Sequence, residues 1–182
     1  MREITTPALA LLIVTVIAAA SLGAVYEITK EPIAHQREQT RDAALRELIP
    51  AAEGFTERSV PRGRAVTAWF IAYRGQERLG HVLSVIAAGY EGPIDMLVAV
   101  GQRGDILGVK IVRCSETPGL GAEAGKPEFT NQFIGKRGRL TVTKNGGGGN
   151  EIDAVAAATV TSRAVADGVN AAMEFYEANR DS

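Results

Sequence analysis

The sequence is short of the side chains that build metal centres and disulfides. Its 182 residues include one cysteine, Cys114, and two histidines, His35 and His81. A single cysteine excludes an internal disulfide and any zinc or iron–sulfur site that needs several thiolates. We therefore expect no metal site, and we expect Cys114 to be a small buried residue at the end of a strand.

The sequence also lacks an excess of charge of either sign. It has 20 basic and 21 acidic residues, a formal net charge of −1, and no run of basic residues. Proteins that bind nucleic acid by neutralising phosphates carry a basic patch or stripe. Nucleic acid is therefore excluded as a partner. The length suits one domain of ordinary size with an appendage.

Charged residues are absent from residues 7–26, which are rich in leucine, isoleucine and valine. As a helix, a run of about 20 residues spans about 30 Å, the thickness of a bilayer core. The run predicts a transmembrane helix. Small residues between Ala18 and Ala24 favour an alternative, a cleaved secretory signal. Basic residues flank the run on both sides and do not decide its orientation.

A second helix is predicted after the apolar run. Residues 36–49 are charged, with Ala44, Leu45, Leu48 and Ile49 on one face, and a proline follows directly. The polar stretch before this helix contains a proline, which we expect to separate the two helices.

The rest of the chain is predicted to form one domain. Charge, glycine and proline in residues 53–64 indicate a connecting loop. We therefore predict a membrane helix with its flank at 1–30, a helical linker at 31–64 and a domain at 65–182.

Strand patterns dominate the first half of this domain. The expected strands are short, rich in β-branched or aromatic residues and separated by glycine-bearing turns: residues 66–73, 79–87, 94–100, 106–113 and 139–143. The connections are too short for crossover helices, so the sheet should be mainly antiparallel. The last helix carries one apolar stripe, formed by Val165, Val169, Ala172, Met173 and Tyr176. The fold class is α+β, an antiparallel sheet packed with helices.

Residues 153–162 read Asp-Ala-Val-Ala-Ala-Ala-Thr-Val-Thr-Ser, just ahead of that last helix. The alanines leave Thr159 accessible, and the first turn of a helix presents N–H groups that favour an anion. An ordinary helix entry, with Thr161 or Ser162 as the N-cap, would also give this pattern.

Two other motifs accompany this stretch. Residues 115–121 read Ser-Glu-Thr-Pro-Gly-Leu-Gly, and residues 89–94 read Gly-Tyr-Glu-Gly-Pro-Ile. Together the three motifs resemble the FMN-binding domain that occurs in the G subunit of the Rnf electron-transport complex and in the C subunit of the sodium-translocating NADH:quinone reductase. The resemblance covers most of the chain.

The resemblance implies a covalently bound flavin. The family's motif runs Asp-x-x-Ser/Thr-Gly-Ala-Thr, and its last threonine, here Thr159, carries FMN as a phosphoester. Two positions of this sequence depart from the motif: Ala156 stands in place of a hydroxyl residue and Ala157 in place of glycine. If residue 157 had a positive φ, alanine would be costly there.

The resemblance also implies which residues surround the flavin. A flat, largely apolar ring is held by closely approaching backbone, an apolar wall and a few polar groups. The expected contacts come from all three motifs: Tyr90, Glu116, Thr117, Gly119, Leu120, Gly121, Ala158, Val160, Thr161 and Ser162. A redox carrier needs no catalytic acid or base, so we expect no catalytic residue.

The function implied by the resemblance is electron transfer within a redox-driven, ion-translocating ferredoxin:NAD oxidoreductase complex. The N-terminus would be cytoplasmic, and the flavin domain would lie on the outer face of the bacterial cytoplasmic membrane, anchored by a single pass. Other membrane subunits would be its partners, and a flavin transferase would attach FMN. Three alternatives remain: the C subunit of the quinone reductase, a self-contained flavin reductase, and a membrane-tethered, non-redox interaction module with a lapsed flavin site.

Overall fold

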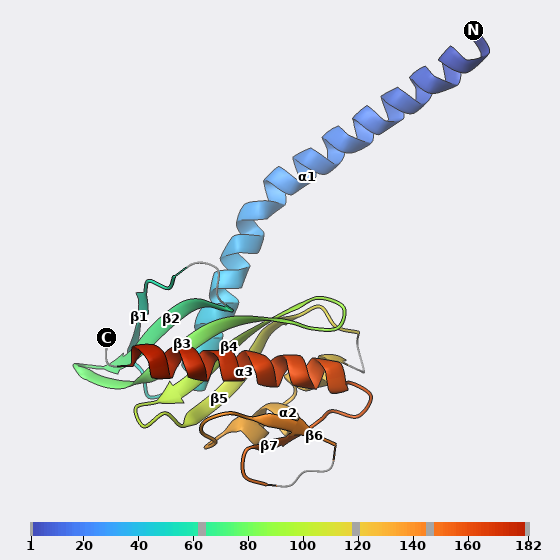
Figure 1. The fold of residues 1–182 in the computed structure, drawn as a ribbon. Coiled ribbons are helices and arrows are strands. Elements are labelled where there is room, and N and C mark those ends of the chain that lie inside the picture. The colour runs from blue at the N-terminus through green and yellow to red at the C-terminus, as the bar shows by residue number, and fades with distance from the viewer. Residues whose placement is uncertain (1, 62–64, 118–120, 145–147, 181–182) are drawn as a thin grey trace. The chain divides into compact units, whose positions relative to one another are not determined.

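The computed structural model describes residues 2–61, 65–117, 121–144 and 148–180. The chain divides into two compact units, one up to Arg41 and one from Asp42 onward (Figure 1). The boundary lies inside a helix. The division of the chain at residues 30 and 64 remains a prediction.

The first element is one continuous helix, α1 (Arg2–Leu48), of 47 residues with Pro7 and Pro32 inside it. The predicted break before residue 36 is therefore wrong. A proline removes one backbone hydrogen bond and crowds the preceding turn, but bonds on both sides can keep a long helix continuous. Just before Pro32, the Thr29 hydroxyl donates to the carbonyl of Val25 at 2.7 Å.

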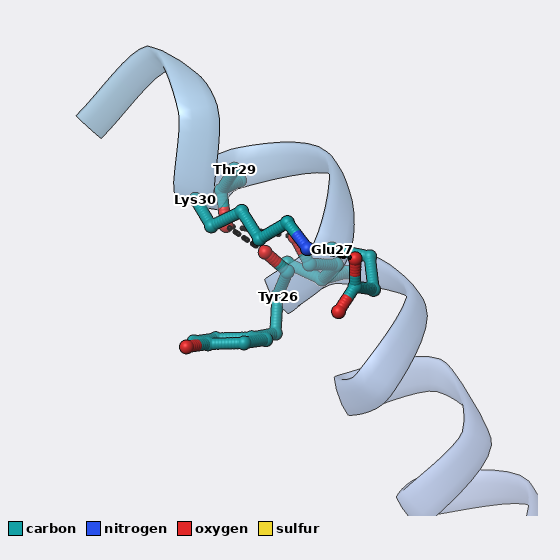
Figure 2. A network of polar contacts seen from close by, with 5 residues as sticks. Tyr26, Glu27, Thr29 and Lys30 are labelled. Carbon is teal, nitrogen blue, oxygen red and sulfur yellow. Dashed lines mark hydrogen bonds and ion pairs between the residues drawn. The ribbon is translucent and has the colours of Figure 1, made fainter. Parts of the chain in front are cut away.

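The large apolar side chains of α1 from Leu9 to Ile28 are each at least half exposed. Within the described chain, α1 is the helix that is long and apolar enough to cross a membrane. The apolar stretch ends in a polar turn where Lys30 pairs with Glu27 beside the exposed Tyr26 (Figure 2). Aromatic and charged residues of this kind are typical of the membrane–water interface.

The second unit is built on a five-stranded sheet in which every neighbouring pair is antiparallel. The strands lie in chain order: β1 (Gly54–Arg58), β2 (Val66–Arg74), β3 (Glu77–Ala88), β4 (Pro93–Gly101) and β5 (Ile106–Cys114). The predicted antiparallel sheet is confirmed. β1 falls in the segment predicted to be a loop, because this mostly exposed edge strand lacks an apolar alternation and is held by its pairing with β2.

Short elements follow the sheet and lead to the last helix. They are η1 (Gly121–Gly125), α2 (Pro127–Thr130), η2 (Asn131–Phe133), β6 (Thr141–Thr143), β7 (Glu151–Asp153) and α3 (Thr159–Asn179). β6 lies within the strand predicted at 139–143. β7 was not predicted; it pairs with β6 in parallel.

Both faces of the sheet are covered. Helix α3 lies along one face (Figure 1), and its predicted stripe from Val165 to Tyr176 is buried in the main core with Met96 and Val98. The end of α1 covers the other face, where Ala44 and Leu45 are buried in a cluster with residues of β2, β3 and β4. This arrangement places the start of α3 near the end of the sheet where β3 turns into β4.

Candidate functional site

The chain enters α3 through a tight turn from Val155 to Ala158, closed by a 3.0 Å hydrogen bond from the Ala158 N–H to the Val155 carbonyl. Its third residue, Ala157, has φ +61°, and it is the one non-glycine residue with positive φ in the described ranges. A turn with positive φ at this position favours glycine. An alanine in this conformation costs about 1–2 kcal/mol. This is the position at which the family motif has glycine.

Ser162 holds this turn from inside the helix. Its hydroxyl accepts a 2.9 Å hydrogen bond from the Val155 N–H and donates one of 2.9 Å to the Ala158 carbonyl. The N-cap is Ala158, and α3 begins at Thr159. The alternative in which Thr161 or Ser162 is the N-cap is therefore wrong, because the turn starts the helix earlier than the hydroxyl pattern indicates.

Thr159 is the first residue of α3 and is half-buried, with exposed alanines at 156 and 157 before it. The N-cap alanine supplies no side-chain acceptor to the N–H groups of the first turn. A phosphate on Thr159 would bring acceptor oxygens and negative charge to the positive end of the helix. The residues present therefore fit a phosphoester at this position.

A buried carboxylate joins the three motifs. Glu116 is 8% exposed, and its Oε1 accepts hydrogen bonds from the N–H groups of Tyr90 (2.7 Å) and Glu91 (3.2 Å). Its Oε2 accepts a 3.0 Å hydrogen bond from the Thr161 hydroxyl. We call these three bonds the Glu116 bridge. The bridge brings the turn between β3 and β4, the segment after β5 and the first turn of α3 to one place.

Two glycines make room for the Glu116 bridge. A Cβ on Gly89 would lie 2.2 Å from Oε1 of Glu116, and one on Gly121 would lie 2.6 Å from its Oε2. Contacts this short require a rearrangement of the site. Gly89 was not singled out from the sequence as a site residue, although its place at the start of a two-glycine turn was a usable signal.

The other predicted site residues are placed as follows. Thr117 donates a hydrogen bond from its hydroxyl to the Glu91 carboxylate. Tyr90 and Val160 expose their side chains, at 74% and 54%. Gly119 and Leu120 lie outside the described residues. The structure therefore gathers the described members of the three motifs at one end of the domain.

A cleft of about 300 Å³ lies beside the turn from Val155 to Ala158. Its walls include Lys126, Phe129, Gln132 and Val155. The side-chain oxygen of Gln132 accepts a 2.7 Å hydrogen bond from the Asp153 N–H, which fixes the backbone ahead of the turn. No local pattern indicated a role for Gln132, because its partner is distant in the chain.

Charged and ionisable groups near the site favour binding over covalent catalysis. The neighbouring Glu123 carboxylate raises the pKa of Lys126, which keeps this lysine cationic at the rim of the cleft. Burial raises the pKa of the half-buried Cys114 thiol at the end of β5, so this thiol is protonated at neutral pH and is a weak nucleophile. Among the described residues, no three His, Cys, Asp or Glu side chains group as a metal site.

Comparison with protein families matches two regions of the chain. Residues 89–174 match the FMN-binding domain, and residues 1–48 match the RnfG N-terminal region. The first region contains the turn from Val155 to Ala158 and the Glu116 bridge, and the second coincides with α1.

Relatives match along most of the chain. A 154-residue match at 36% identity covers 84% of this chain and 80% of the G subunit of the proton-translocating ferredoxin:NAD(+) oxidoreductase complex of Clostridium ljungdahlii. A 187-residue match at 30% identity covers 97% of this chain and 96% of the G subunit of the ion-translocating oxidoreductase complex of Methanosarcina acetivorans.

Two solved structures share the fold. The C subunit of the Na(+)-translocating NADH-quinone reductase from Parabacteroides distasonis has a TM-score of 0.52 at 27% identity, over 60% of each chain. NqrC of Shewanella oneidensis has a TM-score of 0.50 at 26% identity, over 70% of this chain and 66% of that chain.

Proposed function

This chain belongs to the family of G subunits of Rnf-type, ion-translocating ferredoxin:NAD oxidoreductase complexes and has their FMN-binding domain, and we propose that it carries FMN covalently on Thr159. In this proposal the domain relays electrons between neighbouring subunits of such a complex. The observation that supports it most is the position of Thr159, half-buried at the start of α3 behind an N-cap without a side-chain acceptor.

The proposed attachment is a transfer of a flavin phosphoryl group to a hydroxyl. The Thr159 oxygen forms a bond to the phosphorus of FMN, and the pyrophosphate bond that joins FMN to a nucleoside monophosphate in a flavin dinucleotide breaks. The nucleoside monophosphate leaves, and the hydroxyl proton passes to a base of the transferase. The exposed alanines at 156 and 157 leave space for that enzyme.

The bound FMN would supply one- and two-electron redox chemistry, which suits a relay between carriers of different kinds. The protein's part is to bind and orient. The N–H groups of the first turn of α3 would face the phosphate. Tyr90 and Val160 offer exposed apolar surface near the same end of the domain.

We propose that α1 is a retained, single-pass anchor and that the flavin domain lies on the outer face of the membrane. The apolar, exposed span of α1 and its match to the RnfG N-terminal region support the anchor. On the outer face a dissociated flavin would be lost, so a covalent ester has a clear advantage there. Other membrane subunits of the complex and a flavin transferase are the proposed partners.

The test is the intact mass of the full chain, made together with a flavin transferase and purified in detergent. The wild type should be heavier by one FMN ester, and flavin fluorescence should stay with the denatured band. Thr159→Ala should lose both signals, whereas Thr159→Ser, which keeps a hydroxyl, should retain them. The exposed Thr141 provides a matched control, Thr141→Ala, which should load normally.

Two results would contradict the proposal. One is a wild-type protein that stays at the mass of its chain despite an active transferase. The other is a flavin mapped to a side chain other than Thr159. The first result would favour the non-redox, membrane-tethered module, for which the strained Ala157 is the relevant observation. The second would keep the flavin but move its attachment to another residue.

A further inference from the structure

We propose that Glu116 is a positioning residue for flavin attachment: its buried carboxylate holds the first turn of α3 against the turn between β3 and β4, and so fixes Thr159 as an acceptor, without binding the flavin itself. The inference rests on the proposed attachment at Thr159. It begins from the Glu116 bridge, whose bonds to Tyr90, Glu91 and Thr161 measure 2.7, 3.2 and 3.0 Å.

The hydrogen-bonding capacity of Glu116 is largely used within the protein. An ionised carboxylate has about four acceptor positions. Three are taken, two by backbone N–H groups and one by a hydroxyl. Hydrogen bonds to an ionised group are stronger than neutral ones, and they stabilise the buried charge of Glu116.

The bridge acts on the turn that contains Thr159. Thr161, the anchor point of the bridge on α3, lies two residues after Thr159 and is 2% exposed. The residues before Thr159 are held as well. Val155 and Ala158 each form a 2.9 Å hydrogen bond with the hydroxyl of Ser162. The acceptor threonine is therefore held from both directions along the chain.

Such positioning matters for phosphoryl transfer. A displacement of about 1 Å in a reacting group can slow a reaction by about 100-fold. A weak nucleophile such as a threonine hydroxyl gains most from a fixed position. Gly89 and Gly121 lie so close to Glu116 that neither position leaves room for a Cβ, so the side chain is tightly packed where it makes these bonds.

Three variants separate the roles of Glu116. Glu116→Gln keeps an oxygen for the two N–H groups, and its amide can donate to the Thr161 hydroxyl. Glu116→Ala removes the bridge. Thr161→Val removes one bond and preserves the side-chain shape, so it tests the bridge even if Glu116→Ala folds poorly. Glu177→Ala, on the exposed side of α3, is the control.

The measurement is the rate of FMN incorporation into the full-length, detergent-solubilised chain, with a purified transferase and a flavin dinucleotide. For Glu116→Ala and Thr161→Val, the kcat of transfer should fall about tenfold or more, with little change in the KM for the dinucleotide. Glu116→Gln should stay within about threefold of the wild type. The double variant Glu116→Ala/Thr161→Val should be no slower than the slower single variant.

A second readout needs no flavin. Amide hydrogen exchange of the unloaded chain should be faster at residues 90–91 and 160–162 in Glu116→Ala than in wild type. Thr159→Ala should leave that protection unchanged. If the wild type takes up no FMN at Thr159, the proposed function fails, and hydrogen exchange still decides whether the bridge exists.

Three outcomes would overturn the inference. If Glu116→Ala loads FMN at the wild-type rate, or leaves the exchange of both segments unchanged, Glu116 does not position the turn. If Glu116→Gln loads normally but shifts the midpoint potential of the attached flavin, the carboxylate acts on the flavin ring. A potential equal to that of the wild type in Glu116→Gln supports the positioning role.

Discussion

The hydroxyl of Ser162 accepts a 2.9 Å hydrogen bond from the N–H of Val155, seven residues earlier in the chain. The same hydroxyl donates to Ala158, the N-cap of α3. One fully buried side chain therefore fixes both ends of the turn that precedes Thr159. The geometry of the turn from Val155 to Ala158 therefore depends on a residue that follows it in sequence.

Replacing Ser162 by alanine should destabilise the domain. The change leaves the Val155 N–H without its partner, and an unsatisfied, partly buried donor costs about 1–3 kcal/mol. We expect the free energy of unfolding, measured with denaturant on the full chain in detergent, to fall by about 1–2 kcal/mol. Ser59→Ala, at an exposed position, is the control. Equal stabilities of the two variants would show that the bond contributes nothing.

Replacing Ala157 by glycine should stabilise the same turn. Alanine at φ +61° is strained by about 1–2 kcal/mol, and glycine would remove this strain. Glycine also makes the unfolded chain more flexible, so the entropy cost of folding offsets part of the gain in stability. The expected net gain is about 0.5–1 kcal/mol, measured by denaturant unfolding. Ala156→Gly is the matched control, because residue 156 is in the same turn without positive φ, and it should lower stability by about 0.5–1 kcal/mol. Loss of stability in both variants would contradict the strain.

Local patterns predicted the elements that carry their own signal. The apolar stripe of α3 could be predicted because the apolar residues from Val165 to Tyr176 recur at helical spacing. Four strands of the sheet could be predicted from runs of β-branched residues between glycine-containing turns. β1 could not be predicted, because this exposed edge strand forms through its hydrogen bonds to β2 and has no apolar pattern of its own. The continuity of α1 through Pro32 could not be predicted either. A proline favours the end of a helix, and the hydrogen bonds of the turns on both sides keep this helix continuous.

The candidate site was predicted as three separate motifs. The sequence could not show that Glu116 joins them, because its partners Tyr90 and Thr161 are 26 and 45 residues away. Glu116 was expected to contact the flavin directly. The structure shows its carboxylate in hydrogen bonds to the protein, which is the origin of the positioning role proposed above.

Replacing Gly89 by alanine should disrupt the Glu116 bridge. The new Cβ would lie 2.2 Å from Oε1 of Glu116 and 2.6 Å from the carbonyl oxygen of Gly92, so the turn must move. We expect a loss of stability of at least about 1–3 kcal/mol, the range for overpacking, together with slower FMN incorporation. Gly54→Ala, where no atom lies within 4 Å of the new Cβ, should change stability by less than about 0.5 kcal/mol. If Gly89→Ala were as stable as this control, the predicted clash of the new Cβ with Glu116 and Gly92 would be wrong.

His81 lies in an aromatic cluster at the opposite end of the sheet from the Glu116 bridge. Its Nδ1 accepts a 3.0 Å hydrogen bond from the indole N–H of Trp69, and its ring lies 5.1 Å from that of Tyr176. Burial, and next the positive charges of Arg78 and Arg58, lower the pKa of His81 to about 4. Protonation at Nδ1 would also break the bond to Trp69.

The lowered pKa of His81 predicts acid sensitivity between about pH 6.5 and pH 4. In this window the unfolded chain binds a proton at His81 that the folded chain does not, so stability falls as pH falls. The loss should reach about 2 kcal/mol near pH 5 and about 3 kcal/mol below pH 4.

Denaturant unfolding at a series of pH values should show a shallower decline for His81→Gln, which keeps an acceptor but does not titrate. His35→Gln, at an exposed position of α1, should follow the wild-type curve. Parallel curves for wild type and His81→Gln would mean that His81 is not the group responsible.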